Sequence, residues 1–312
     1  MSCCLCCFKK TDNDMVYHKS CLKKLFDSEK IPVIEFKSTD IVYELSKTIG
    51  KMSISGVQIK ASAKLNKKSN IIEIVKTGGT HILKPEPAEY PNLPQNENLC
   101  MNLAAMVRIE TPSHGLFYMA DKKLCYIVKR FDRDKDNQKI HVEDMAQLLE
   151  LPSNSKYESS LEKVGKALLV FSSKPYLDLI LFIERVIFCF LTGNGDMHLK
   201  NWSVLRNIEN DYQLSPAYDL ISSKLYLIDE DESALTLNGK RRKIKLSDFR
   251  ALSDYLHIDS KSFENTINKF VDLKNEIIQF IDTYSRSECS FKEVNKITDN
   301  IIKNYKIIEN TV

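Results

Sequence analysis

The most informative stretch of the sequence is Gly193-Asn194-Gly195-Asp196-Met197-His198-Leu199-Lys200-Asn201-Trp202. It directly follows the most apolar predicted helix, residues 177–191, and a strand-like segment, residues 202–205, comes after it. A carboxylate and an amide at this spacing can face one pocket, with Asp196 as the base or orienting group for a hydroxyl and Asn201 as a ligand of Mg²⁺. Asn-Gly-Asp is also strong turn chemistry, and the stretch taken alone fits a plain turn equally well.

Two other residues of the stretch have expected roles. Lys200 can neutralise a transferred phosphoryl group. His198 is grouped with the catalytic residues, although we expect it to serve as a structural hydrogen-bonding residue rather than as the general base.

A second carboxylate follows in Pro216-Ala217-Tyr218-Asp219-Leu220. Carboxylate oxygens are ligands that Mg²⁺ prefers, so Asp219 is suited to hold the ion across phosphates. As an isolated residue, Asp219 fits a helix cap just as simply.

Upstream, Lys84 ends a short predicted strand and Glu97 opens the next predicted helix, residues 95–107. A strand lysine paired with a glutamate on the following helix is how kinases fix the lysine that contacts the α- and β-phosphates. Alone, Lys84 fits an ordinary surface lysine and Glu97 a residue favoured by the helix dipole. The order and spacing of all these residues together favour a phosphoryl-transfer site.

Glycine is scarce, with nine residues in 312, and no Gly-rich nucleotide loop is present. Neither G-x-G-x-x-G nor G-x-x-x-x-G-K-[ST] occurs, which argues against Rossmann and Walker nucleotide binding. The segment Ser53-Ile54-Ser55-Gly56-Val57-Gln58 is the candidate replacement for a glycine-rich lid, using Gly56 and the backbone N–H groups around Val57.

The charge balance is nearly even, with 45 Lys and Arg against 42 Asp and Glu. This balance gives no support to nucleic-acid binding through bulk charge, and the basic run at residues 240–243 fits a solvated loop. The most apolar segment, residues 176–192, contains Asp178, Glu184 and Arg185, so we expect a buried helix and no membrane span. Nine cysteines behind an N-terminus without an apolar signal region predict a reduced, cytoplasmic location.

The pattern along the chain predicts an α+β fold with two lobes. We expect a Cys-rich segment at residues 1–30, a strand-rich N-lobe at 31–132 and a helical C-lobe at 133–312. The predicted strands are residues 53–59, 71–75, 81–84 and 124–131. Beyond residue 133, the predicted helices are residues 142–151, 157–169, 177–191, 247–257, 261–284 and 291–305.

Cysteines cluster near the N-terminus at positions 3, 4, 6, 7 and 21. Cys4-x-x-Cys7 with His18-x-x-Cys21 fits a four-ligand zinc site. Cys3-x-x-Cys6 is an equal alternative to the first pair, and unliganded thiols in a small Cys-rich knot are the alternative to metal binding.

The sequence resembles the HipA/HipT toxin kinases. The resemblance lies in the segments at 53–58, 81–84, 96–97, 128–133, 141–144, 196–201 and 217–220. It implies a bilobal Ser/Thr protein kinase that uses ATP and Mg²⁺, with Asp196 as catalytic base. It also implies that Asn201 and Asp219 bind Mg²⁺, that Lys84 contacts phosphate, and that Lys129–Phe131 is the hinge that meets adenine.

The short region before the lid is similar to the HipT form, whose missing piece is the separate small protein HipS beside the DNA-binding HipB. The resemblance implies a toxin–antitoxin module, a cytosolic aminoacyl-tRNA synthetase as target, with the tryptophanyl enzyme favoured, and autophosphorylation at Ser53 or Ser55. Two other functions stay open: a degenerate kinase fold that serves as a binding module, and a small-molecule kinase.

Overall fold

The computed structural model describes residues 3–11, 15–41, 59–207, 210–287 and 290–309. The chain forms two compact units. Unit 1 comprises Met1–Asn102, Pro112–Gln138 and Thr283–Phe291, and unit 2 comprises Leu103–Thr111, Lys139–Asp282 and Lys292–Val312. The predicted Cys-rich segment is therefore part of unit 1, because its apolar side chains Leu5, Phe8, Leu22 and Phe26 are buried there.

Unit 1 is built on a five-stranded antiparallel sheet in the order β2-β1-β3-β5-β4. Its strands are β1 (Ala61–Asn66), β2 (Ile71–Ile74), β3 (His81–Pro85), β4 (His114–Tyr118) and β5 (Leu124–Lys129). The register places Lys84 of β3 opposite Tyr126 of β5. Alternating burial along β1 and the buried centre of β5 are typical of a sheet with a packed face.

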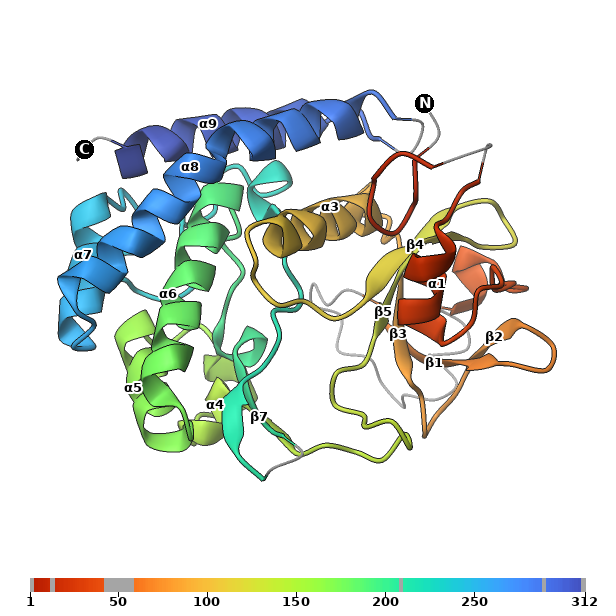
Figure 1. Ribbon diagram of the computed structural model, residues 1–312, viewed down its shortest axis with the longest axis horizontal. Helices are drawn as coiled ribbons and strands as arrows, with labels where there is room; N and C mark the ends of the chain where they lie inside the picture. The colour runs from red at the N-terminus through yellow and green to blue at the C-terminus, as the bar shows by residue number, and fades with distance from the viewer. Residues whose placement is uncertain (1–2, 12–14, 42–58, 208–209, 288–289, 310–312) are drawn as a thin grey trace. The chain divides into compact units, whose positions relative to one another are not determined.

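The helices of unit 1 include α1 (Lys19–Phe26) and the part of α3 (Leu93–Met106) up to Asn102 (Figure 1). The ring of Phe26 meets the edge of Phe117 in β4, with centroids 5.2 Å apart. His81 of β3 donates from Nε2 to the carbonyl of Leu25 at 2.8 Å. The N-terminal segment is thus held to the sheet by both apolar and polar contacts.

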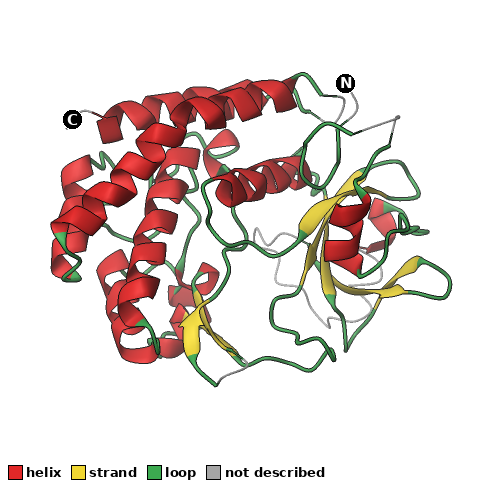
Figure 2. Cartoon of the chain, in the orientation of Figure 1, coloured by secondary structure: helices red, strands yellow, loops and turns green. Residues whose placement is uncertain are grey.

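Unit 2 consists mainly of helices (Figure 2). They are α4 (Met145–Leu148), α5 (Leu161–Phe171), α6 (Pro175–Thr192), α7 (Leu246–Tyr255), α8 (Ser260–Ser285, whose last three residues belong to unit 1) and α9 (Val294–Glu309). A small antiparallel sheet in the order β6-β7-β8 joins β6 (Val142–Asp144), β7 (Ser203–Arg206) and β8 (Tyr212–Leu214).

Helix α6 lies at the centre of unit 2, and most of its residues are buried. Pro175 stands at its first turn, where a missing N–H costs nothing, and Gly193 ends it in a left-handed conformation with φ of 69°. Its charged residues have partners or cover: Glu184 pairs with Lys269 of α8 at 2.8 Å. Among the described residues, no helix combines the length and apolar character needed to cross a membrane.

The predicted helices of the C-terminal half are present, and their ends differ from the predicted ones by up to four residues. The prediction of a helix over residues 142–151 was wrong at its start, because Val142–Asp144 form β6 and only Met145–Leu148 are helical. Asp144 ends the strand and caps α4, accepting a hydrogen bond from the N–H of Gln147. The predicted strand 53–59 begins in the segment outside the described residues.

Candidate active site

The loop after α6 has a conformation that requires both of its glycines. At Gly193, whose φ is positive, an added Cβ would lie 2.4 Å from Nδ2 of Asn300. At Gly195, a Cβ would lie 2.4 Å from the backbone oxygen of Asp231. Since side chains at these positions have no room, Gly193 and Gly195 fix the path by which the chain reaches Asp196.

Asp196 and Asn201 are linked directly. The Nδ2 of Asn201, in the short 3-10 turn Leu199–Asn201, donates to the backbone oxygen of Asp196 at 3.0 Å. This bond uses the amide N–H of Asn201, and Oδ1 is the atom of the same side chain that can coordinate a cation. The carboxylate of Asp196 accepts a hydrogen bond from the hydroxyl of Tyr157 at 2.5 Å.

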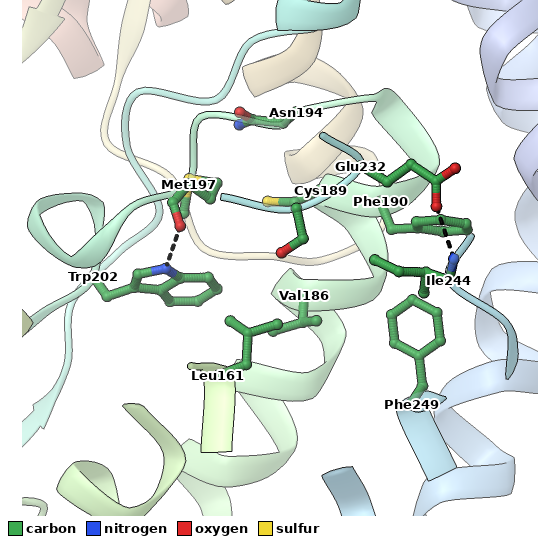
Figure 3. Close-up of a pocket in the computed structure, with 11 residues that line it drawn as sticks. Leu161, Val186, Cys189, Phe190, Asn194, Met197, Trp202, Glu232, Ile244 and Phe249 are labelled. Carbon is green, nitrogen blue, oxygen red and sulfur yellow. Dashed lines mark hydrogen bonds between the residues drawn. The ribbon is translucent and has the colours of Figure 1, made fainter. Parts of the chain in front are cut away.

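Apolar residues of unit 2 support this loop from one side. Figure 3 shows a pocket in which Met197 and Trp202 of the loop face Val186, Cys189 and Phe190 of α6. The indole Nε1 of Trp202 donates to the carbonyl of Met197 at 3.2 Å. A loop anchored in the core by a large buried side chain keeps its polar groups in place.

His198 has a structural position. Its Nε2 lies 2.9 Å from Nζ of Lys156, and because an ammonium group can only donate, Nε2 accepts. The ring is buried, and burial lowers the pKa of His198. In this position His198 accepts a hydrogen bond from Lys156, which suits a structural role.

Lys200 and Asp219 are connected through Tyr218. The hydroxyl of Tyr218 donates to the carbonyl of Lys200 at 2.9 Å and also contacts the hydroxyl of Ser203. The side chain of Lys200 donates to Oγ of Ser153 at 2.7 Å. Asp219 itself has a φ of 53°, in the left-handed region that Asp and Asn tolerate better than other residues. Tyr218 thus ties the segment that carries Asp219 to the loop that carries Asn201.

Glu230 is a titratable neighbour that the sequence did not reveal. Its carboxylate accepts from Ser223, whose Oγ in turn accepts from the N–H of Gly195. Burial, together with the negative charge of Asp196 and against the effect of the Ser223 bond, raises the pKa of Glu230 to about 7. Tyr157 and Glu230 occur as single polar residues in loops, where no sequence pattern identifies them, and Tyr218 lies in the segment 217–220 without having been given a role.

Unit 1 contains the predicted lysine–glutamate pair. Nζ of Lys84 in β3 lies 2.6 Å from Oε1 of Glu97 in α3, and both side chains are almost completely buried. The ammonium group also lies 5.7 Å from the ring centroid of Tyr126. A buried pair of this kind fixes the lysine far more firmly than a surface pair would.

The predicted hinge begins at the end of β5. The N–H of Lys129 donates to Ser113 and that of Arg130 donates to Thr80, both at distances within 2.9 Å. The side chain of Lys129 pairs with Asp27 at 3.1 Å. Phe131 lies two residues beyond the end of this strand. Any contact to adenine through Lys129–Phe131 therefore has to use groups other than the N–H of residues 129 and 130.

The remaining predicted site residues fall into two groups. Cys4, Cys7, His18 and Cys21 lie together in unit 1. Ser53, Ser55, Gly56 and Val57, the predicted lid residues, lie outside the described residues.

The donor groups fit the chemistry of a nucleotide–metal complex. Oδ1 of Asn201 and the carboxylate of Asp219 are oxygen ligands of the kind that Mg²⁺ takes. Lys84 would supply a positive charge to phosphate. These residues are distributed over two units, with Lys84 in one and Asp196, Asn201 and Asp219 in the other.

An antiparallel sheet with a buried lysine–glutamate pair and a helical unit with this Asp–Asn loop define an α+β, protein-kinase-like fold. Solved structures with this fold include HipA of Shewanella oneidensis in complex with HipB and operator DNA, with a TM-score of 0.70 and 20% identity, covering 90% of this chain and 72% of that one. The Helicobacter pylori proinflammatory kinase CtkA matches with a TM-score of 0.52 and 18% identity, over 80% of this chain and 94% of that one.

The chain belongs to the HipA-like C-terminal domain family, whose model matches residues 52–277. Among curated proteins, it is 34% identical over 214 residues to "Putative kinase Y4dM" of Sinorhizobium fredii, which covers 63% of this chain and 51% of that protein. It is 28% identical over 210 residues to the serine/threonine-protein kinase toxin HipA of Shewanella oneidensis, over 61% of this chain and 47% of HipA. The chain thus spans about half the length of these relatives.

Proposed function

We propose that the protein is a Mg-ATP-dependent serine/threonine protein kinase that acts as the toxin of a toxin–antitoxin module. The observation that carries the proposal is the bond from Nδ2 of Asn201 to the backbone of Asp196, with Tyr218 fixing the segment of Asp219 beside it. One hydroxyl-orienting carboxylate and two cation ligands are what phosphoryl transfer requires of a protein.

In this proposal, Asp196 accepts the proton of the substrate hydroxyl. Asn201 and Asp219 hold Mg²⁺, which neutralises charge on the phosphates when bound. Lys84, fixed by Glu97, contacts the α- and β-phosphates, and Lys200 balances the charge of the group in transfer. His198, as a neutral acceptor from Lys156, keeps the loop in shape.

Two other functions compete with this one. A degenerate kinase fold that serves only to bind a partner has no chemical need for Lys84, Asp196, Asn201 and Asp219 together, so their joint presence disfavours it. A small-molecule kinase would use the same residues, and only the substrate separates it from a protein kinase.

One labelling experiment distinguishes the three. The protein is incubated with γ-labelled ATP and Mg²⁺, first alone and then with bacterial cytosol, beside Asp219→Asn. This variant removes a cation ligand while Asn still tolerates the positive φ at that position. Label on one cytosolic protein, lost in D219N, supports the protein kinase. Label only in small molecules indicates a small-molecule kinase, and no transfer from ATP overturns the proposal in favour of a binding module.

We further propose a cytoplasmic HipT-like toxin that is controlled by HipS-like and HipB-like partners. Support comes from the HipA relative, which was solved with HipB and operator DNA. The proposed target is an aminoacyl-tRNA synthetase, with the tryptophanyl enzyme first. Purified tryptophanyl-tRNA synthetase that takes up label and loses aminoacylation activity would support this choice. If another protein carries the cytosolic label, the choice of target is wrong.

The proposed regulation is autophosphorylation of Ser53 or Ser55 in the lid. A phosphate adds a charge of about −1.5 to −2, which would repel the phosphates of ATP and lower activity. We expect S53A/S55A to show no added phosphate by intact-mass spectrometry after incubation with Mg-ATP. Full phosphorylation of this double variant would contradict the assignment.

A further inference from the structure

The N-terminal segment of unit 1 brings three thiols and one imidazole to a single point. The four candidate ligand atoms of Cys4, Cys7, His18 and Cys21 all lie within 4.8 Å of one another. Nδ1 of His18 lies 3.4 Å from Sγ of Cys7 and 4.0 Å from Sγ of Cys21. In a tetrahedral zinc site, Zn–S distances of about 2.3 Å and Zn–N distances of about 2.0 Å place ligand atoms about 3.5 to 3.8 Å apart. The distance from His18 to Cys7 is close to this spacing, and the four atoms together are somewhat more widely spaced than in a closed shell.

The imidazole of His18 is oriented as a metal ligand. Its Nε2 lies 3.0 Å from the backbone oxygen of Lys10, and because a carbonyl can only accept, Nε2 carries the proton. In the neutral imidazole that binds a metal, Nδ1 is then the nitrogen with the lone pair, and it lies toward the thiol of Cys7. A histidine ligand that donates its other ring N–H to a backbone carbonyl is the usual outer-shell arrangement of protein metal sites.

The backbone around Cys4 is also shaped for a bound thiolate. The N–H of His18 donates to Sγ of Cys4 at 3.3 Å, and the N–H of Phe8 donates to the carbonyl of Cys4 at 2.8 Å. Phe8 has a φ of 56°, so the chain turns tightly just after the second cysteine of Cys4-x-x-Cys7. All three thiols are free rather than joined in disulfides.

The structure separates the two cysteine pairs that the sequence left equal. Cys6 is buried against β4, where its Sγ would lie 2.5 Å from a Cβ added to Gly115. Its carbonyl accepts from Nδ2 of Asn102 at 2.8 Å. Cys6 is thus used in packing against the sheet and α3, and Cys3 is not part of the cluster of four.

The segment that carries the cluster lies against α3, which contains Glu97, and against β4. The carbonyl of Leu5 accepts from Nδ2 of Asn98, the residue after Glu97 in α3, and also from the N–H of Leu116 in β4. The hydroxyl of Tyr17, beside His18, donates to the carbonyl of Leu116 at 2.9 Å. Whatever fixes residues 4–21 therefore also supports α3 and β4.

We propose that Cys4, Cys7, His18 and Cys21 bind one structural Zn²⁺, which holds the N-terminal segment against β4 and α3. Three thiolates and one imidazole complete the tetrahedral shell, so no position is left open for a substrate. The site does not depend on the proposed kinase function and stands or falls separately from it.

Metal analysis of the purified full chain tests the site without any variant. We expect one zinc per chain, released in step with modification of three thiols by an organomercurial and replaced by Co²⁺ with the visible absorption of a tetrahedral thiolate site. After reconstitution with Zn²⁺ under reducing conditions, no zinc in the chain and no Co²⁺ spectrum would overturn the proposal, and iron in its place would overturn the assignment to zinc.

Variants test which residues are ligands. C7S and H18A are expected to lose the metal at chelator concentrations that wild type resists, and H18C to retain it because a thiolate replaces the imidazole. C3S is the matched control and is expected to bind like wild type. Loss of zinc in C3S with retention in C7S would show that the other pair coordinates. In wild type, metal removal should lower the thermal midpoint, and an unchanged midpoint would contradict the supporting role.

Discussion

At the scale of single residues, the surroundings of Asp196 determine what the loop can do. Tyr157 donates to its carboxylate, Asn201 donates to its backbone oxygen, and Glu230 lies close enough that the two negative charges affect each other. Asp196 is therefore held in one orientation from several sides. Catalysis by positioning depends on such fixed groups.

Glu230 makes stability depend on pH. Its pKa is raised from the ordinary 4.5 to about 7, so the folded protein keeps a proton that the unfolded chain has already released. Between these two values the folded state binds more protons, and its stability must fall as pH rises. We expect the free energy of unfolding of wild type, minus that of Glu230→Gln, to decrease as pH rises from 4.5 to about 7. Below and above this range the difference should not change with pH.

Thermal unfolding of both proteins at a series of pH values measures this difference. Glutamine keeps the shape of the side chain and the acceptor for Ser223, and other titrating groups contribute equally to both proteins. A difference that does not change with pH would show that Glu230 ionises normally in the folded state.

The sequence predicted the residues that follow a spacing rule and missed those that do not. Asp196, Asn201 and Asp219 were singled out as candidates because their order and separation match a known chemistry. Tyr157 reaches Asp196 from a turn far upstream, and its position depends on packing that no local pattern records. Likewise, only the path of the backbone shows that Cys4, rather than Cys3, lies with Cys7, His18 and Cys21.

At the scale of elements, the pair between β3 and α3 joins stability to function. Removing one partner of a buried ion pair leaves the other charge unpaired in the interior, at a cost of about 3–5 kcal/mol. We expect Lys84→Met to lower the free energy of unfolding by about this amount. The double variant K84M/E97L should recover most of the stability, because apolar residues of similar volume replace both charges.

Urea unfolding measures the stabilities, and phosphoryl transfer is expected to be lost in both variants. The exposed pair of Lys64 and Glu73 provides the control, since Lys64→Met at such a site costs no more than about 1 kcal/mol. If K84M/E97L is as unstable as K84M, the loss of stability does not come from leaving the charge of Glu97 unpaired, and the prediction is wrong. If K84M transfers phosphate normally, Lys84 has no catalytic role.

Secondary structure was predictable where one element provides its own pattern. Helices α5 to α9 have apolar residues at helical spacing, and their ends matched within a few residues. Strand β6 was missed because its three residues are stabilised by pairing with Ser203–Leu205, about sixty residues later. The burial of Phe26 against β4 could not be predicted either, because the eight residues of α1 contain no information about the strand that α1 contacts.

At the scale of the whole molecule, the N-terminal segment is part of unit 1 and not an appendage. Phe26 is buried between His81 and Phe117 of the sheet. We expect Phe26→Ala to lower the free energy of unfolding by about 3–5 kcal/mol, as for other large core side chains. Phe171→Ala, at an exposed position in α5, is the control and should cost far less.

Equilibrium unfolding followed by near-UV circular dichroism measures this effect. Hydrogen exchange of Phe26→Ala provides the second measurement. If only residues 1–30 lose protection and the sheet keeps it, the segment folds independently of the rest of unit 1.

We propose that Asp196 serves phosphoryl transfer from Mg-ATP. Its most direct test is the initial rate of transfer for Asp196→Asn beside Asp254→Asn, an exposed aspartate of α7, after both variants are shown to unfold at the wild-type temperature. Asparagine keeps the size of the side chain and an acceptor for Tyr157 but cannot take a proton. We predict that D196N is slower than wild type by about 100-fold or more and that D254N is unchanged. Transfer by D196N at the wild-type rate would contradict the proposed role of Asp196.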